Sequence, residues 1–481
     1  MREIDLSVDK LLAALLRLDP IRGVHVLDGG GARNSRHLIA GFDPFESVEA
    51  YGAELIVRRR GSEIVTRERG SILSLLDERL AHHRAPRRSS PFFNPPGACV
   101  ATFAYDLARQ FLRLRSTKPQ TDHSTPEEPD ATLAFFDTLV VHDYTRRATY
   151  VTGPDGARVE ETCEVLSAVA VRAGEGTKAL EGTSTLEGTN AARDSEGSDA
   201  VVTSNFTRDE YLAAVSRIKE HISAGDIYQA NLTQQLSCRL ATGDSPEAVF
   251  LRLRRDHPAP FAAFLRRDCG DTVVSASPER FLRVEVDEWG GRTIEAWPIK
   301  GTRRRGINKD EDARLRAELL ASEKDRAENT MIVDLLRNDL GRVCRYGSVE
   351  VAEWCAVEEH PTLFHLVSKV RGSLRPEVAA GELMRATFPC GSITGAPKLR
   401  AMEILDSVET APRGFSMGAL GYFAFDGALD LNVAIRTLTV RGGVARFNVG
   451  GGVVADSHPE AEYDESLLKA RALLRALGAE E

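Results

Sequence analysis

One stretch near the middle of the chain limits every fold that the sequence can adopt. Residues 173–200, "AGEGTKALEGTSTLEGTNAARDSEGSDA", contain two leucines, no aromatic residue and a short degenerate repeat, "ALEGTS" followed by "TLEGTN". Such a composition cannot bury enough apolar surface to offset the entropy lost on ordering. We therefore predict a disordered acidic linker, or an inserted loop, over residues 173–202. It separates an N-terminal lobe, residues 1–172, from a C-terminal domain, residues 203–481.

The segments on either side of the linker carry both helical and strand periodicity. In the N-terminal lobe, runs such as "TLAFFDTLVVHDY" and "ATYVTG" are typical of strands. After the linker, "TRDEYLAAVSRIKEHISAG" has Thr207 and Glu210 in capping-box spacing and ends near Gly225, which predicts a helix. The next stretch, "IYQANLTQQLSCRL", changes to a period of two and predicts a strand. The pattern indicates an α/β fold.

That predicted strand has one polar but uncharged face. Alternate residues from Tyr228 to Leu240 are apolar, with Gln234 as an exception. The opposite face carries amides and hydroxyls: Gln229, Asn231, Thr233, Gln235 and Ser237. Such a face either is solvated or lines a polar cavity, and periodicity alone leaves both interpretations open.

Composition narrows the partners and the compartment. A formal net charge of −9 gives no electrostatic reason to expect binding to nucleic acid or to an anionic membrane. No apolar run approaches the roughly 20 residues that a membrane span needs, and the N-terminus lacks the apolar core of a signal peptide. The seven cysteines are scattered without a C-x-x-C pair. We therefore expect reduced thiols in a cytoplasmic protein.

Two predicted helices each carry a pair of carboxylates one turn apart. Asp325 and Glu328 lie in "SEKDRAENTMIVDLLRNDL", and Glu462 and Glu465 lie in "HPEAEYDESLLKARALLRAL", with Lys469 on the same stripe. Either pair alone is most simply a solvated acidic edge. If the two helices meet in a cavity, the carboxylates repel one another unless a cation lies between them. Magnesium suits such a set of hard oxygen ligands and commonly serves an anionic substrate.

Three further stretches raise a question of chemistry. In "WPIKGTRRRG", Lys300 is either the first member of a solvated basic run or a buried amine with a reaction to perform. The arginines that follow, residues 303–305, could supply positive charge beside it. "FPCGSITGAPK", which contains Ser392 and Thr394, and "NVGGGVVADS" are two loops rich in free amides. Both could be ordinary turns, although two such loops in one domain suit an anion site.

Together these stretches resemble the chorismate-utilising enzymes, a family that includes anthranilate, aminodeoxychorismate, isochorismate and salicylate synthases. The resemblance covers nearly all of residues 205–475. It rests on ten ordered motifs: "GDIYQANLTQQ", "SASPERFL", "PIKGT", "AENTMIVDLLRNDLGRV", "HLVSKVRG", "FPCGSITGAPK", "GYFAFDG", "NVAIRT", "GGGVVADS" and "EYDESLLKA". It implies an anthranilate-synthase-like α/β fold of the α+β type, in which two large, mostly antiparallel sheets pack face to face with helices outside. Both parts of the chain would then contribute strands, with residues 203–481 forming the chorismate-binding catalytic domain.

The resemblance also implies a magnesium site and the residues that hold the substrate. Glu328 and Glu465 would bind Mg²⁺ directly, with Asp325 and Glu462 around them, and the ion would hold the ring carboxylate of chorismate. The groups implied for the enolpyruvyl carboxylate and the rest of the anion cradle are Tyr422, Arg436, Lys469 and the amides of Gly450, Gly451 and Gly452. Arg436 would act through a bidentate fork.

The remaining implied residues surround the ring. Thr302 and His365 would flank it, and Thr394 and Gln229 complete the predicted set of substrate-binding residues. Glu279, from "SPE", would be the general acid that protonates the departing 4-hydroxyl, a role that typically contributes about 10²–10⁴-fold.

Two positions discriminate between members of the family. In the members that add water, the position of Gln229 is a lysine that activates the water, and a neutral amide cannot serve as that base. In the anthranilate-forming members the position of Lys300 is typically alanine, whereas in the members that aminate C4 it is the lysine of "PIKGT". The resemblance therefore implies that Lys300 is a nucleophile and that the product is 4-amino-4-deoxychorismate, a precursor of para-aminobenzoate and folate. The family's tryptophan-binding signature, Leu-Leu-Glu-Ser, is absent, since the comparable stretch reads "HVLDGGGARNS".

The source of ammonia lies elsewhere. A glutaminase of the usual triad type needs a cysteine in a Gly-x-Cys-x-Gly turn, and none of the seven cysteines has that context. We therefore expect a separate glutaminase subunit. The alternatives are a component I of anthranilate synthase and a catalytically inert chorismate-binding scaffold subunit, although a scaffold would not need the full set of catalytic and carboxylate residues.

Overall fold

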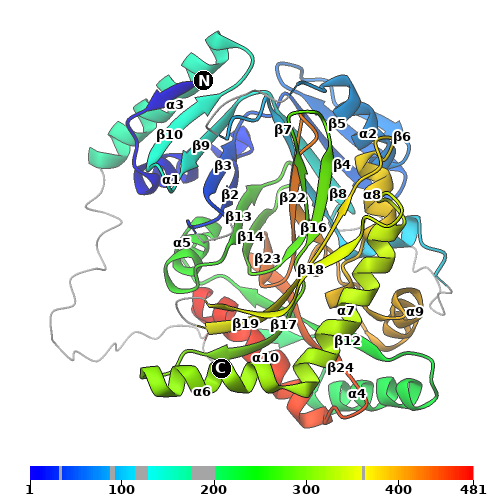
Figure 1. Ribbon diagram of the computed structural model, residues 1–481. Helices are drawn as coiled ribbons and strands as arrows, with labels where there is room; N and C mark the ends of the chain where they lie inside the picture. Colours follow the sequence, from blue (N-terminus) through cyan, green and yellow to red (C-terminus); the bar gives the residue numbers. More distant parts are fainter. Residues whose placement is uncertain (32–34, 87–92, 115–127, 176–200, 360–362, 480–481) are drawn as a thin grey trace, which may run out of the picture.

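The helix and the strand predicted after the linker are present in the computed structural model, which describes residues 1–31, 35–86, 93–114, 128–175, 201–359 and 363–479 (Figure 1). The helix begins after Thr207, whose side chain accepts a hydrogen bond from the N–H of Glu210 while the Glu210 carboxylate accepts one from the N–H of Thr207. It is followed by Gly225 at φ +81°. The predicted strand covers Gln229–Arg239. Both predictions are confirmed.

The described strands form two antiparallel sheets of twelve strands each. The first sheet has the following order, with β20 (Gly395–Ala396) pairing with β12 beside the main path: β1 (Arg2–Ile4), β10 (Ala148–Thr152), β9 (Leu139–Asp143), β3 (His37–Gly41), β2 (His25–Asp28), β13 (Phe261–Arg266), β14 (Thr272–Ser277), β23 (Thr437–Arg441), β24 (Val444–Val453), β12 (Gln229–Arg239) and β11 (Val202–Ser204).

The second sheet is built in the same way, with β18 (Glu350–Glu359) pairing with β19 beside the main path. Its order is β17 (Ile299–Arg304), β19 (Leu363–Ser373), β16 (Arg292–Ala296), β15 (Arg280–Val286), β22 (Leu429–Val433), β21 (Ala419–Ala424), β7 (Ala98–Phe103), β8 (Ala131–Phe136), β4 (Glu46–Tyr51), β5 (Glu54–Arg59) and β6 (Thr66–Arg69).

Helices lie on the outside of the two sheets (Figure 1). α10 packs on β24 and on α4, α9 packs on β12, and α7 packs on β17, β18 and β19. The described helices are α1 (Val8–Leu16), α2 (Ile72–His82), α3 (Gly156–Glu175), α4 (Arg208–Ser223), α5 (Pro246–Asp256), α6 (Lys309–Ala321), α7 (Glu323–Gly341), α8 (Ala380–Thr387), α9 (Lys398–Val408) and α10 (Pro459–Ala476), with the 3₁₀ turns η1 (Pro20–Arg22), η2 (Tyr105–Gln110) and η3 (Gly391–Ile393). Among the described residues, no helix combines the length and apolar character that crossing a membrane requires.

A buried apolar layer joins the two sheets. Ile39 and Leu265 of the first sheet belong to the same buried cluster as Val100, Phe136 and Leu420 of the second. Larger apolar clusters lie between each sheet and its helices. The predicted fold class, two mostly antiparallel sheets packed face to face with helices outside, is therefore confirmed.

Both predicted parts of the chain contribute strands to both sheets. The parts meet where β2 pairs with β13 in the first sheet and where β7 pairs with β21 in the second. Most of the predicted linker, residues 173–202, lies outside the described residues: α3 ends at Glu175 and β11 begins at Val202. Strands from both sides of the predicted linker thus belong to the same two sheets, so the linker does not separate two independent folding units.

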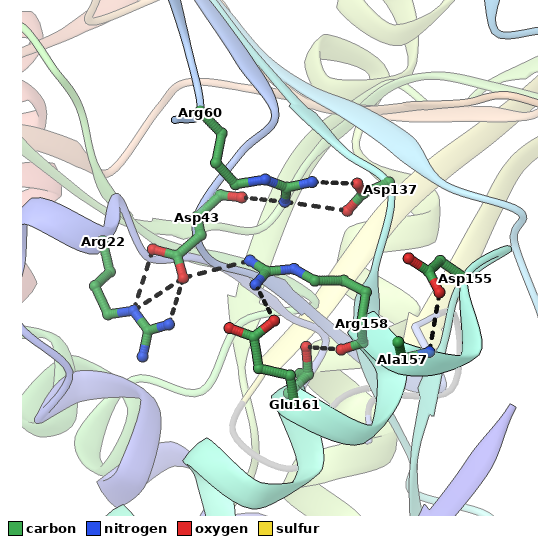
Figure 2. A network of polar contacts seen from close by, with 9 residues as sticks. Arg22, Asp43, Arg60, Asp137, Asp155, Ala157, Arg158 and Glu161 are labelled. Atoms are coloured by element: carbon green, nitrogen blue, oxygen red, sulfur yellow. Dashed lines mark hydrogen bonds and ion pairs between the residues drawn. The ribbon is translucent and has the colours of Figure 1, made fainter. Parts of the chain in front are cut away.

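A polar network binds together the places where the N-terminal strands change sheets (Figure 2). Asp43 lies between β3 of the first sheet and β4 of the second, and Asp137 lies between β8 of the second and β9 of the first. Asp43 accepts hydrogen bonds from Arg22 and Arg158, the latter at 3.4 Å. Arg60 donates to the Asp43 carbonyl at 3.0 Å and to Asp137 at 2.5 Å. The network therefore fixes both sheet crossings.

Candidate active site

Lys300 lies among carboxylates. It is half-buried on β17, the edge strand of the second sheet. The next residue, Gly301, has φ +83°, and a Cβ there would come within 2.9 Å of the Asp325 side chain, so β17 lies directly against α7. The Lys300 ammonium is near enough to three carboxyl groups to favour their ionised forms: those of Glu279, Glu328 and Glu465. The lysine is therefore more than the first member of a solvated basic run.

Glu279 is the most deeply buried carboxyl group of this cluster. It follows β14, is 4% exposed, and its Oε1 has no hydrogen-bond partner among the described residues. Burial raises the pKa of Glu279 to about 7. The Lys300 ammonium, the Ser392 hydroxyl and the Ile299 N–H oppose this rise. A carboxyl group with a pKa near neutrality can hold and release a proton at physiological pH, as a general acid must.

The three arginines after Lys300 are directed to other elements. Each guanidinium pairs with a carboxylate of α6 or α7: Arg303 with Asp325, Arg304 with Glu311 and Arg305 with Asp312. Their charge is offset where it lies. The sequence-based suggestion that they raise the positive potential around Lys300 therefore lacks support from the structure.

The carboxylates of α7 and α10 lie close enough to affect one another. Burial raises the pKa of Glu328, and the negative charges of Asp325 and Glu465 add to the rise, while Lys300 and Lys324 oppose it. On α10, a Cβ at Gly451 would lie 2.9 Å from Glu462 and 3.8 Å from Glu465. The two predicted pairs are thus brought to one place by α7, α10 and β24.

The donor set of these helices fits a magnesium ion, although it is not a ready-made metal centre. Among the described residues, no three His, Cys, Asp or Glu side chains are arranged as a metal site. Mg²⁺ keeps several waters and needs only one or two protein carboxylates. Glu328 and Glu465 supply two that repel each other. A small divalent cation bound between these two carboxylates would relieve their repulsion.

Lys469 is engaged with its own helix and with the glycine strand. Its Nζ lies 2.8 Å from Glu465 and donates a hydrogen bond to the carbonyl of Gly450 at 2.9 Å. Although burial of Glu465 opposes it, the Lys469 charge and hydrogen bond lower the pKa of that carboxyl group. Lys469 thus lies beside the glycines of β24, but its ammonium must leave Glu465 before the two groups can bind different ligands.

The glycines of β24 allow β12 and α10 to approach closely. Gly450, Gly451 and Gly452 pair with Thr233, Leu232 and Asn231 of β12. A Cβ at Gly450 would lie 1.9 Å from the Leu232 carbonyl, and one at Gly452 would lie 2.4 Å from Gln229 Nε2. In the described ladder, β23 pairs with β24 only from Val444 to Arg446. The opposite edge of the glycine stretch therefore lacks a strand partner and leaves amides for an anion.

Gln229 lies in the same region with its amide unused. It is fully buried at the start of β12, and neither its Nε2 nor its Oε1 has a hydrogen-bond partner among the described residues. Burying an unpaired amide costs about 1–3 kcal/mol. Such a group is expected where a ligand completes its hydrogen bonds.

Thr302 and His365 form one unit across β17 and β19. They are register partners, and Thr302 Oγ1 lies 2.9 Å from His365 Nδ1. Thr394 differs from the prediction in its hydroxyl, which donates within its own loop to the carbonyls of Cys390 at 3.1 Å and Gly391 at 3.2 Å. Its backbone carbonyl accepts a hydrogen bond from the Asn231 N–H. Thr394 therefore fixes the loop against β12.

Arg436 lies in the loop between β22 and β23 with φ +48°. Its carbonyl accepts a hydrogen bond from the N–H of Ala276, close to Glu279 in the chain. No described residue hydrogen-bonds to its guanidinium, and burial lowers its pKa. A half-buried guanidinium without an anion is suited to a carboxylate ligand.

Tyr422 lies on β21, in the second sheet. It lines a cavity of about 510 Å³, together with Phe93, Arg283, Trp297 and Asp430. Its ring contacts that of Phe93 edge-on, with the centroids 6.2 Å apart. Since a strand presents successive side chains to opposite faces, the motif alone could not decide which cavity the tyrosine enters. The assignment of Tyr422 to the enolpyruvyl carboxylate stays a prediction.

The polar face of β12 is neither solvated nor an open lining. Asn231 and Thr233 are buried. They contact a buried ion pair, Glu409–Arg413, which lies between α9 and β21. At the start of the strand, Gln229 keeps a buried amide that has no hydrogen-bond partner among the described residues. Most of this face therefore packs against the Glu409–Arg413 ion pair, and only its first residue, Gln229, lies at the candidate site.

Three further residues belong to this region although they are not among the predicted site residues: Lys324, Glu409 and Arg413. The Lys324 ammonium lies 4.0 Å from the Glu328 carboxylate, and its positive charge helps to lower the pKa of Glu465. Its spacing of four residues from Glu328 on a helix could have revealed it. Glu409 and Arg413 are also four residues apart, but Pro412 interrupts any helix between them. No sequence pattern identifies that pair.

Known proteins are similar to this chain in sequence and in fold. A family model described as chorismate binding enzyme matches residues 26–475. Aminodeoxychorismate synthase component 1 of Bacillus subtilis (strain 168) is 33% identical over 488 residues, which cover 99% of this chain and 96% of that protein. Anthranilate synthase component 1 of Acetivibrio thermocellus is 34% identical over 454 residues, covering 93% and 88%. The crystal structure of anthranilate synthase component I from Streptococcus pneumoniae matches with a TM-score of 0.70 at 26% identity, covering 91% of this chain and 92% of that one.

Proposed function

The chain belongs to the family of chorismate-binding enzymes, and on that premise we propose that it is the chorismate-aminating component of an aminodeoxychorismate synthase. The proposed reaction converts chorismate and ammonia to 4-amino-4-deoxychorismate and water, on the route to para-aminobenzoate and folate. Relatives with two different names match the chain, so the family alone leaves the product open. The observation that carries the choice is Lys300, an amine that lies among the carboxyl groups of Glu279, Glu328 and Glu465.

In the proposed reaction, Lys300 is the nucleophile and Glu279 moves the protons. The Lys300 ammonium first loses a proton to solvent, and the neutral amine then adds to C2 as the ring double bond shifts and the C4–O bond breaks. Glu279 gives its proton to the departing hydroxyl, which leaves as water, and then takes one from the nitrogen of the adduct. Ammonia adds to C4, the double bond shifts back, and Nζ leaves C2 with the proton that Glu279 returns. Splitting a difficult substitution in this way is the advantage of covalent catalysis.

We propose Mg²⁺ as the cofactor. Glu328 and Glu465 would hold it, and Asp325 and Glu462 would orient those two carboxylates. When bound, the ion would supply positive charge for the ring carboxylate of chorismate. Glu465 would have to leave its ion pair with Lys469 to take this role. Lys469 is then free to turn toward the substrate from the Gly450 carbonyl that it already contacts.

The rest of the chain's residues bind and orient the substrate. Arg436 binds the enolpyruvyl carboxylate by a two-pronged contact, assisted by free amides of Gly450, Gly451 and Gly452. The Thr302–His365 pair packs beside the ring. Gln229 donates to or accepts from a substrate hydroxyl, and its neutral amide cannot deprotonate a water, which is why we exclude isochorismate and salicylate as products.

We propose that ammonia comes from a separate glutaminase subunit. Relatives of nearly full length carry the name "component 1", which implies a partner component. All seven cysteines are unpaired and none lies in a Gly-x-Cys-x-Gly turn, so this chain offers no thiol in the usual glutaminase context. Unpaired thiols also favour a reducing, cytoplasmic compartment.

The test is the regiochemistry of the product. With chorismate, Mg²⁺ and ammonium at mildly alkaline pH, the nitrogen should be found at C4, and a pyruvate-eliminating lyase should then yield 4-aminobenzoate. Anthranilate as the main product would identify the second candidate, an anthranilate synthase component. A protein that binds chorismate but releases no aminated product with ammonium or with its glutaminase would be a scaffold subunit.

A further inference from the structure

Arg413 and Glu409 form an ion pair that is shielded from solvent beneath β12. Their side chains are 1% and 8% exposed. Arg413 Nε donates to Glu409 Oε2 at 2.9 Å, and Nη2 donates to Oε1 at 2.7 Å. The ring of Tyr105 packs against the guanidinium, with its centroid 4.3 Å away. The reaction proposed above does not use this pair.

The pair joins two separate segments of backbone. Arg413 Nη1 donates to the carbonyl of Ile393 at 2.7 Å, and Nη2 donates to that of Asn231 at 2.6 Å. Glu409 accepts hydrogen bonds from both the N–H and the hydroxyl of Thr233, each at 2.9 Å. One guanidinium thus binds the loop η3–β20 and β12 at the same time, while its counter-ion binds β12 again.

This junction lies where an ordinary strand ladder ends. β20 pairs with β12 only at Gln229 and Ala230, and one further bond runs from the Asn231 N–H to the Thr394 carbonyl. Beyond that point the loop leaves the strand, and the Arg413 fork replaces the missing backbone partners. Gln229 and Thr394 therefore lie on the short ladder that the ion pair terminates.

Stability alone gives a poor reason for such a pair. Replacing a buried ion pair by apolar residues of similar volume is often neutral or stabilising, because removing two charges from water is costly. An arginine fork does provide fixed geometry, since its planar donors reach two acceptors in set directions. The arrangement therefore favours a role in placing the segments that it joins.

We propose that Arg413 and Glu409 are positioning residues, which hold the loop of Thr394 against the start of β12 and so keep Gln229 in the place where it contacts chorismate. This inference rests on the proposed function, because it takes Gln229 to be a substrate-binding residue. Loss of the pair lets the loop and the strand separate, so the substrate is bound less well even though the chemical groups remain.

The chain contains a matched control. Arg266 Nη1 donates to the Leu18 carbonyl at 2.6 Å, and Nη2 donates to the Leu16 carbonyl at 2.7 Å and to Glu247 at 2.8 Å. This second fork also joins two backbone carbonyls and a carboxylate, but it secures the end of α1, which carries no predicted site residue. The two double variants are Arg413→Met with Glu409→Leu, and Arg266→Met with Glu247→Leu.

The test measures kcat and KM for chorismate with Mg²⁺ and ammonium, together with far-UV circular dichroism. For Arg413→Met/Glu409→Leu we expect kcat/KM to fall by about 10–100-fold, mainly through KM, because small misplacements of binding groups have effects of this size. The control double variant should stay within about twofold of the unmodified protein. An unchanged KM in a folded Arg413→Met/Glu409→Leu protein, or an equal loss in the control, would overturn the inference.

A milder variant keeps the inference testable if the double variant does not fold. Arg413→Lys retains the charge but cannot reach both carbonyls, so KM should rise by several-fold, and an unchanged KM would overturn the inference. The proposed function is tested separately. If the unmodified protein does not aminate chorismate, the proposed function is wrong, whatever the variants do. An active unmodified protein whose variants keep its KM rejects the positioning role alone.

Discussion

Two polar regions of this molecule use the same kinds of side chain in opposite ways. In the network of Figure 2, Asp43 accepts hydrogen bonds from Arg22 and Arg158, and Arg60 pairs with Asp137. In the candidate site several buried groups lack partners. Oε1 of Glu279, both amide atoms of Gln229 and the guanidinium of Arg436 have no hydrogen-bond partner among the described residues.

The difference shows that pairing, more than residue type, separates a structural region from a functional one. In Figure 2 the contacts of Asp43 with Arg22 and Arg158, and of Asp137 with Arg60, secure the segments that cross between sheets, so these carboxylates have their partners within the folded chain. An unsatisfied buried polar group costs about 1–3 kcal/mol. A fold retains several such groups in one place where a ligand will satisfy them.

The largest effect that we expect to separate the two regions concerns Glu279. Glu279→Gln keeps the shape of the side chain but cannot give up a proton, so kcat should fall by about 10²–10⁴-fold. Turnover of chorismate at saturating ammonium is the measurement. Asp43→Asn, in the paired network, is the matched control and should leave turnover unchanged. Retention of near-normal kcat by Glu279→Gln would remove it from the chemistry.

Glu279→Gln should lower activity but raise the stability of the folded protein. Burial raises the pKa of Glu279 to about 7 from an ordinary value of 4.5. The folded state therefore binds more protons than the unfolded state between these values, and stability falls as pH rises through this window. Glu279→Gln escapes that loss, so at pH 8 it should be more stable than the unmodified protein by as much as about 3 kcal/mol.

Denaturant unfolding at pH 8 and near pH 4.5 measures this difference. The gain should be present at pH 8 and should vanish near pH 4.5, where both forms of the residue are neutral. A variant less stable than the unmodified protein at pH 8 would show that Glu279 is satisfied in the folded state, against the comparison drawn here.

A smaller effect is expected at the carboxylates of α10. Glu462 is proposed to orient the groups that hold Mg²⁺, and losing such a partner typically weakens metal affinity by about 10–100-fold. Calorimetric titration of Glu462→Gln with Mg²⁺ should show this loss. The exposed neighbour Glu460 provides the control, since Glu460→Gln should bind Mg²⁺ as the unmodified protein does. Equal affinity in both variants would argue against a metal site at this face of α10.

The smallest effect belongs to the paired network itself. Asp43 has φ +53°, a conformation that asparagine also tolerates, so Asp43→Asn removes the charge without straining the backbone. Because the carboxylate is partly exposed, we expect a loss of only about 1 kcal/mol in the free energy of unfolding. A loss beyond about 3 kcal/mol would mean that the network behaves as a fully buried one.

Local patterns predicted much of the fold and part of the site. Capping spacing and the change of period identified α4 and β12, because both follow from interactions between residues close in sequence. The carboxylate pairs of α7 and α10 were also visible as helical spacing. Their meeting was not, since it depends on how two sheets bring helices from distant parts of the chain together.

Three outcomes mark where sequence reasoning stops. The motif of Tyr422 does not state which face of its strand is turned inward, so only the structure shows that it lines a cavity with Phe93 and Trp297. Thr394 uses its hydroxyl within its own loop. The Arg413–Glu409 pair spans a break at Pro412 and contacts residues from far along the chain, so only the folded structure could show it.

The central claim is that Lys300 is a nucleophile, and trapping its adduct tests that claim most directly. The unmodified protein is incubated with chorismate and Mg²⁺ in the absence of ammonia, then digested and examined by mass spectrometry, with Lys300→Ala in parallel. The account predicts that the peptide containing Lys300 gains the mass of chorismate less one water, that ammonia discharges the adduct, and that Lys300→Ala forms neither adduct nor C4 amine. A Lys300→Ala protein that aminates C4 at the unmodified rate, with no adduct on the unmodified protein, would contradict it.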